Sequence, residues 1–309
     1  MDLVKSRISI FWVVLLLGIG IVLLGGCARV EVTLTPTLTQ VPEIINTPTD
    51  EIPTIIPEPL AAKVNGVGIP LTLFKAELLQ YKNIAIESGS NTDPKEETKI
   101  VLDKLVDDYI LAKAAEEAGY LIDDNTLNAK SDALKGAIKD GGTLKDWQER
   151  NGYTEDAFKV ALRISMMATW QRDQIISSVA DTTEQVNARQ ILVLDAALAE
   201  KIYSQLKSGE DFTVLARQYD PQLGGTLGWF PRGYLTLPEL EDAAFILQPG
   251  QYSPVVKTAF GYQIIQVVER QAQRKLTPDA LKALQKKAIE KWLIDKRGQS
   301  KIEILSLGG

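Results

Sequence analysis

The chain is 309 residues long, with 45% hydrophobic and 24% charged residues, a composition that is ordinary for a globular protein and leaves room for two domains. Its formal net charge of −6 argues against a nucleic-acid-binding surface, which needs clustered lysine and arginine. The sequence contains no histidine, which excludes histidine-based acid–base catalysis, histidine-dependent triads and the common zinc sites. We therefore expect no metal, no cofactor and no nucleic-acid partner.

The first 27 residues have the order of a signal peptide. Lys5 and Arg7 precede an apolar run over residues 8–24, which is followed by small residues. The run closes on LGGC at residues 24–27, which resembles a bacterial lipobox and implies diacylglyceryl transfer to Cys27 and cleavage before it. We therefore expect a lipid-anchored, extracytoplasmic protein. The alternative is an uncleaved transmembrane anchor, because an apolar run of about 17 residues only just reaches spanning length.

A segment rich in proline and threonine follows. Residues 28–59 contain six prolines and show neither a helical nor an alternating apolar pattern. This composition predicts an extended tether. The alternative, that the prolines are ligands for a proline-reading partner, is weaker because no repeated P-x-x-P pattern appears.

Amphipathic helices are predicted across most of residues 60–180. A strand-like segment at residues 62–69 comes first, and its Asn65-Gly66 pair predicts a tight turn. Apolar residues then recur every three or four positions, as they do on helices that pack against a core. Four Thr or Asp residues stand where their side chains can accept hydrogen bonds from a first helical turn. These predicted N-caps are Thr72, Asp123, Thr143 and Thr154.

The C-terminal segment is predicted to hold one more helix. Thr277-Pro278-Asp279 gives it a typical start, and Gly298 marks its end. The alternation at residues 302–304 predicts a short strand, although residues 305–307 restart that alternation one residue out of phase.

Strands and helices are both predicted within residues 186–270. An apolar run rich in branched residues indicates the first strand, Asp211 is placed to cap a helix, and Pro238 begins another helix with acidic residues in its first turn. The predicted order is a strand at 190–194, helices at 198–207 and 212–218, a Gly-rich strand at 224–230, a helix at 238–247 and two strands that close on 262–268.

Six short motifs follow one another along this segment. They are ILV at 191–193, GEDF at 209–212, GGTLGWF at 224–230, PELEDAAF at 238–245, GQYSPVV at 250–256 and FGYQII at 260–265. In this order they resemble the parvulin (rotamase) peptidylprolyl isomerases. The resemblance implies an α+β fold, in which helices surround a small antiparallel or mixed sheet.

The order of the parts also resembles the SurA/PrsA-type foldases, in which an all-α chaperone domain precedes the rotamase unit. The resemblance implies that residues 60–180 are completed by residues 275–309. The parvulin-like domain of residues 186–270 would then be an insertion in a discontinuous helical domain.

The resemblance also implies an apolar pocket that grips a proline ring. Its wall falls on Leu227, Phe230, Leu235 and Leu240. Parvulins usually have Met and Phe where Leu235 and Leu240 stand, so we expect a proline pocket of a different shape.

A polar cluster accompanies this pocket in active parvulins. Its two facing histidines correspond to Gln190 and Gln263, and its central Asp or Cys corresponds to Asp220. Because glutamine both donates and accepts, we expect a Gln190–Gln263 hydrogen bond with Asp220 nearby. Either the pair preserves isomerisation at a reduced rate, or the unit is a retired catalyst that binds extended segments. Each glutamine taken alone is more simply a sheet-surface residue.

These expectations together describe an extracytoplasmic, membrane-anchored foldase. Its substrates would be Xaa-Pro bonds in unfolded or partly folded exported proteins. The first alternative is a non-catalytic holdase that retains a rotamase fold for binding. The second, a purely structural lipoprotein, leaves the predicted pocket unexplained.

Overall fold

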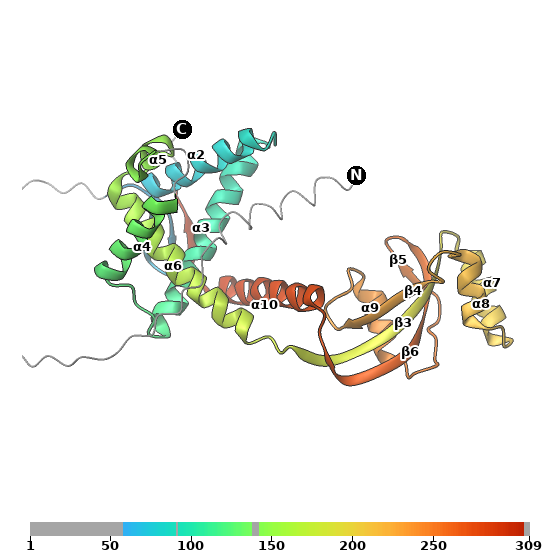
Figure 1. The fold of residues 1–309 in the computed structure, drawn as a ribbon. Helices are drawn as coiled ribbons and strands as arrows, with labels where there is room; N and C mark the ends of the chain where they lie inside the picture. Colours follow the sequence, from blue (N-terminus) through green and yellow to red (C-terminus); the bar gives the residue numbers. More distant parts are fainter. Residues whose placement is uncertain (1–57, 91, 138–141, 306–309) are drawn as a thin grey trace, which may run out of the picture. The chain divides into compact units, whose positions relative to one another are not determined.

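The computed structural model describes residues 58–90, 92–137 and 142–305, whose arrangement is drawn in Figure 1. The predicted signal peptide, the lipobox residue Cys27 and all but the last two residues of the predicted tether lie outside the described residues. None of the helices in the described part is long and apolar enough to cross a membrane.

Helices dominate the first half of the described chain. The central helix, α3, buries Val101, Leu105 and Tyr109, which pack with Leu73 and Phe74 of α2. This packing follows from the predicted spacing of apolar residues every three or four positions. The helices are α2 (Leu71–Glu87), α3 (Pro94–Glu117), α4 (Asp124–Ala137), α5 (Leu144–Arg150) and α6 (Glu155–Ser177).

Three of the four predicted N-caps are confirmed. Asp123 accepts from the Thr126 N–H at 2.7 Å, Thr154 caps α6, and Thr143 forms a full capping box with Asp146. The Thr72 cap is wrong, because the N-cap position of α2 is Pro70, two residues earlier, and Thr72 lies inside the helix.

A small sheet joins the two ends of the described chain. Its strand order is β2 (Val67–Pro70), β1 (Leu60–Val64) and β7 (Ile302–Ile304), and both pairings are antiparallel. The β1–β2 turn is the predicted one, with positive φ at Asn65 and Gly66. The strand predicted at residues 302–304 is confirmed as β7.

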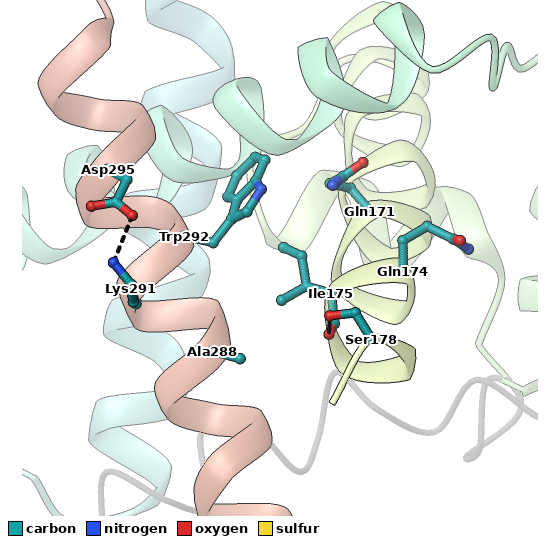
Figure 2. Close-up of a pocket in the computed structure, with 8 residues that line it drawn as sticks. All are labelled: Gln171, Gln174, Ile175, Ser178, Ala288, Lys291, Trp292 and Asp295. Carbon is teal, nitrogen blue, oxygen red and sulfur yellow. Dashed lines mark hydrogen bonds and ion pairs between the residues drawn. The ribbon is translucent and has the colours of Figure 1, made fainter. Parts of the chain in front are cut away.

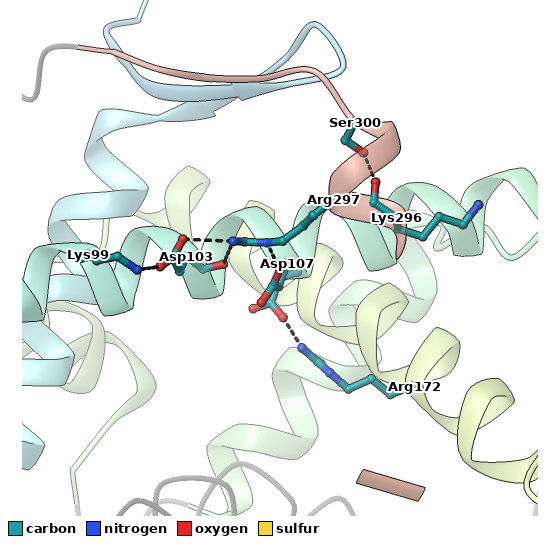
Figure 3. A network of polar contacts seen from close by, with 8 residues as sticks. Lys99, Asp103, Asp107, Arg172, Lys296, Arg297 and Ser300 are labelled. Carbon is teal, nitrogen blue, oxygen red and sulfur yellow. Dashed lines mark hydrogen bonds and ion pairs between the residues drawn. The ribbon is translucent and has the colours of Figure 1, made fainter. Parts of the chain in front are cut away.

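The C-terminal helix α10 (Pro278–Gln299) packs against α3 and α6. Its Arg297 lies between two carboxylates of α3, donating from Nε to Asp107 at 2.6 Å and from Nη2 to Asp103 at 3.1 Å (Figure 3). Thr277 caps this helix, as the sequence predicts. The chain segments before and after the rotamase-like part are therefore in direct contact.

The rotamase-like part is built on a four-stranded antiparallel sheet of order β4 (Thr226–Pro231), β3 (Thr182–Val193), β6 (Gly261–Lys275), β5 (Val256–Thr258). The strands β3 and β6 are much longer than the predicted ones and pair along almost their whole length. Together with the helices, this sheet confirms the predicted α+β class. The boundaries of the separate domains stay a prediction.

The two faces of this sheet are covered by different helices. Ile191 and Val193 of β3 point to one face, where they pack with α7 (Ala196–Lys207) and α8 (Phe212–Tyr219). Val186 and Ala188 point to the other face, where they pack with α9 (Pro238–Ile246). This division follows from the two-residue period of strand side chains.

Candidate functional site

The four residues predicted to form a pocket lie together on the α9 face of the sheet. Phe230 at the end of β4 and Leu240 on α9 are buried, with 1% and 2% of their surface exposed. Leu227 and Leu235 are only partly buried and pack against the same cluster. Phe230 and Leu240 therefore lie inside this cluster, whereas Leu227 and Leu235 are the members that keep exposed surface.

The glutamines predicted to replace the parvulin histidines point to this same face. In the β3–β6 register, Gln190 lies opposite Ile265, and Leu192 lies opposite Gln263. Because residues two apart share a face, both glutamine side chains lie on the side of Ile265, which belongs to the α9 cluster. The six residues of the predicted site other than Asp220 thus share one face.

The predicted hydrogen bond between the two glutamines is wrong: none joins them among the described residues. The register makes Gln190 and Gln263 diagonal rather than direct neighbours, at a typical separation of about 7–8 Å between backbone positions. Gln263 instead donates from Nε2 to Thr258 Oγ1 at 2.7 Å. The Oε1 atoms of both glutamines are buried without a hydrogen-bond partner.

Asp220 lies at the C-terminal end of α8, and its carboxylate is engaged by the loop that follows. It accepts hydrogen bonds from the N–H groups of Leu223 at 3.1 Å and Gly225 at 3.0 Å. These hydrogen bonds, of which the one from Leu223 has the largest effect, lower the pKa of Asp220 below its ordinary value. The carboxylate is therefore ionised at neutral pH. Asp220 is therefore a loop-organising residue and makes no side-chain bond to either glutamine.

Gly225 connects this loop to the site through the backbone. Its N–H bonds to Asp220, and its carbonyl oxygen accepts the N–H of Gln190 at 2.7 Å. Asp220 is therefore linked to the backbone of Gln190 through Gly225.

Two polar residues of the site were missed from the sequence. Thr258 ends β5 and is the hydrogen-bond partner of Gln263, and Ser253 is buried and accepts the N–H of Ile265 at 3.1 Å. The signal for Thr258 is its place beside the tight β5–β6 turn, where it pairs with Gly261, two residues before Gln263. Within the described residues there is no group of three or more metal-ligating side chains that could hold a metal ion.

Two family models match the chain. Residues 175–269 match the PpiC-type peptidylprolyl isomerase domain, and residues 55–139 match the SurA-like N-terminal domain.

Curated relatives named as the foldase protein PrsA match a larger part of this chain than either family model does. PrsA of Caldanaerobacter subterraneus subsp. tengcongensis is 32% identical over 53% of this chain and 55% of its own length. PrsA 3 of Bacillus anthracis is 31% identical over 68% of this chain and 70% of its own length. The chain thus spans little more than half the length of the Caldanaerobacter protein.

Among solved structures, a PrsA peptidylprolyl isomerase from Bacillus cereus is 26% identical. The match covers 70% of this chain and 81% of that chain, with a TM-score of 0.44.

Proposed function

Because the chain belongs to the PrsA family of foldases and carries a PpiC-type isomerase domain, we propose that it catalyses cis–trans isomerisation of Xaa-Pro bonds in exported proteins. The observation that carries this proposal is one sheet face that combines an apolar cluster with two unsatisfied amide oxygens. Leu227 and Leu235 supply accessible apolar surface, and Gln190 and Gln263 supply the amides.

The reaction needs no covalent chemistry. The Xaa-Pro bond rotates over a barrier of about 18–20 kcal/mol, and in the twisted state its nitrogen regains a lone pair. An apolar pocket that grips the proline ring and a hydrogen-bond donor near that nitrogen both favour the twisted state over the planar one. The cluster around Leu227 and Leu235 fits the first role.

Gln263 can contribute to the second role electrostatically, without a histidine. Its partner, Thr258 Oγ1, can either accept or donate a hydrogen bond. The Gln263 carboxamide can therefore turn over and keep this bond through Oε1, provided that the Thr258 hydroxyl leaves the Gly261 carbonyl oxygen, to which it donates at 3.2 Å. The NH₂ group then occupies the buried position of the unsatisfied oxygen, from which it acts on the substrate through its dipole and not by direct contact.

The place of action is proposed from the N-terminal sequence. Residues 1–27 have the form of a signal peptide with a lipobox, and the relatives are named as foldases. We infer that lipidated Cys27 anchors the protein to the outer side of the membrane. The proline-rich tether would let it act on unfolded or partly folded chains as they emerge.

Shortening a pocket side chain is expected to reduce isomerisation. Leu235→Ala removes three carbons from the accessible wall, and kcat/KM for an Xaa-Pro peptide is expected to fall about tenfold or more. The matched control is Leu198→Ala, since Leu198 of α7 is also partly buried but packs against the cluster on the opposite face of the sheet. Equal losses in both variants, with both folded by circular dichroism, would contradict the pocket.

A second candidate function, holding unfolded chains without catalysis, is favoured by a groove between α6 and α10. It measures about 430 Å³. Ile175, Ala288 and Trp292 give it an apolar floor, and Gln171 and Ser178 add amide and hydroxyl groups that can bond a peptide backbone (Figure 2). Suppressed aggregation of an unfolded protein, without faster isomerisation of a peptide, would select this function.

A further inference from the structure

A buried carboxylate holds one wall of the proposed pocket. Glu241 on α9 is only 8% exposed. Its Oε1 accepts the N–H of Gly233 at 2.7 Å, and its Oε2 accepts those of Tyr234 and Leu235, each at 3.0 Å. In the described part of the chain no ion pair includes Glu241, whereas its neighbour Asp242 pairs with Arg232 at 3.1 Å.

These contacts differ from the role that the sequence predicts for an acidic residue in a first helical turn. A carboxylate that complements the helix macrodipole lies near the free N–H groups in the first turn of its own helix. The Glu241 carboxylate instead closes a concave loop of three consecutive backbone N–H groups. Gly233, at φ +84°, adopts the left-handed conformation that starts this loop.

The position of this loop decides the shape of the pocket. The loop between β4 and α9 carries Leu235, while Leu240 immediately precedes Glu241 on α9. One carboxylate therefore ties the wall that contains Leu235 to the helix that contains Leu240. Because three hydrogen bonds join the Glu241 carboxylate to this loop, Glu241 constrains the distance between these two walls.

We propose that Glu241 is a positioning residue that sets the width of the pocket and hence its selectivity for proline over an open-chain residue. This inference deepens the proposed isomerase function and rests on it. Glu241 does not touch the substrate. It acts through Leu235, the accessible leucine of the loop.

Glu241→Gln is the variant that tests this role. It keeps the size of the side chain but replaces one acceptor oxygen by an NH₂ group, which then faces an N–H donor. Asp242→Asn is the matched control, because it removes the same charge from the next residue of α9, where the partner is the exposed Arg232. Both variants are made in the full chain, and their folding is checked by circular dichroism.

Two readouts are needed. By NMR, the Gly233, Tyr234 and Leu235 amides are expected to exchange about tenfold faster with solvent in Glu241→Gln and to be unchanged in Asp242→Asn. The affinity for a short Ala-Pro peptide is expected to fall about tenfold in Glu241→Gln, with little change for the matched Ala-Ala peptide. Unchanged exchange of the three amides would overturn the positioning role.

The same experiment separates this inference from the function on which it rests. A wild-type protein that binds the two peptides equally would overturn the proposed function and the selectivity role together. Faster exchange without a change in proline preference would overturn the selectivity role alone.

Discussion

Gly225→Ala is expected to prevent stable folding of the rotamase-like part, with a loss of more than about 4 kcal/mol in the free energy of unfolding. An alanine Cβ at this position would lie 1.8 Å from the carbonyl oxygen of Gln190. The obstacle is backbone in the middle of the sheet, so it cannot move aside as a flexible side chain would. In addition, the φ of +69° at Gly225 is unfavourable for any residue with a Cβ.

Gly228→Ala is the matched control for this prediction. Gly228 lies in the same strand region at φ +76°, but no atom lies within 4 Å of its added Cβ. Only the backbone strain remains, which costs about 1–2 kcal/mol. Urea unfolding of both variants measures the difference. Similar losses in the free energy of unfolding for the two variants would show that the close approach to the Gln190 carbonyl oxygen does not affect stability.

Asp108→Asn is expected to destabilise the helical part by about 3–5 kcal/mol. Asp108 is buried on α3 and is the shared partner of Lys104, at 3.0 Å, and Arg172 of α6. The neutral amide would leave two cations in a low-dielectric interior with less compensation. Asp132→Asn, which removes an exposed partner of Lys135, is the control and is expected to have no measurable effect.

The difference in stability between wild type and Asp108→Asn should depend on pH if its origin is electrostatic. Burial alone would raise the pKa of Asp108, but Lys104 and Arg172 lower it below the ordinary value of 3.8. A lowered pKa stabilises the folded state fully above the ordinary pKa and loses this effect as the pH falls through the folded-state pKa. The gap in stability between wild type and Asp108→Asn should therefore narrow below about pH 3.8. A gap that stays constant into strong acid would contradict the ion-pair explanation.

Much of the fold follows from local signals in the sequence. Helix starts were predictable where a Thr or Asp side chain satisfies free N–H groups, as at Thr143 and Thr154. The Thr72 cap was wrong because the N-cap position falls two residues earlier, on Pro70, whose ring fixes φ where the helix starts. The strand at residues 302–304 had only a weak pattern, and its stability comes from pairing with β1 at the other end of the chain.

The sequence predicts which face of the sheet carries the candidate site, but not the hydrogen bonds that its residues make. The two-residue period of strands places Gln190 and Gln263 on one side once their strands are aligned. Their diagonal register depends on where β3 and β6 pair, and nothing in either strand alone fixes that. The partner of Gln263, Thr258, and the three N–H groups bound by Glu241 come from loop geometry. Such geometry carries no periodic signal.

The most direct test of the proposed function is the isomerisation rate of a short Xaa-Pro peptide, measured by NMR exchange spectroscopy with the purified protein from about pH 5.5 to 8. The proposal predicts a rate above the uncatalysed one that varies less than about twofold over this range, because the chain has no histidine and Asp220 stays ionised. No acceleration at any pH would contradict catalysis. A bell-shaped profile centred near pH 6.5 would contradict a site built on glutamines.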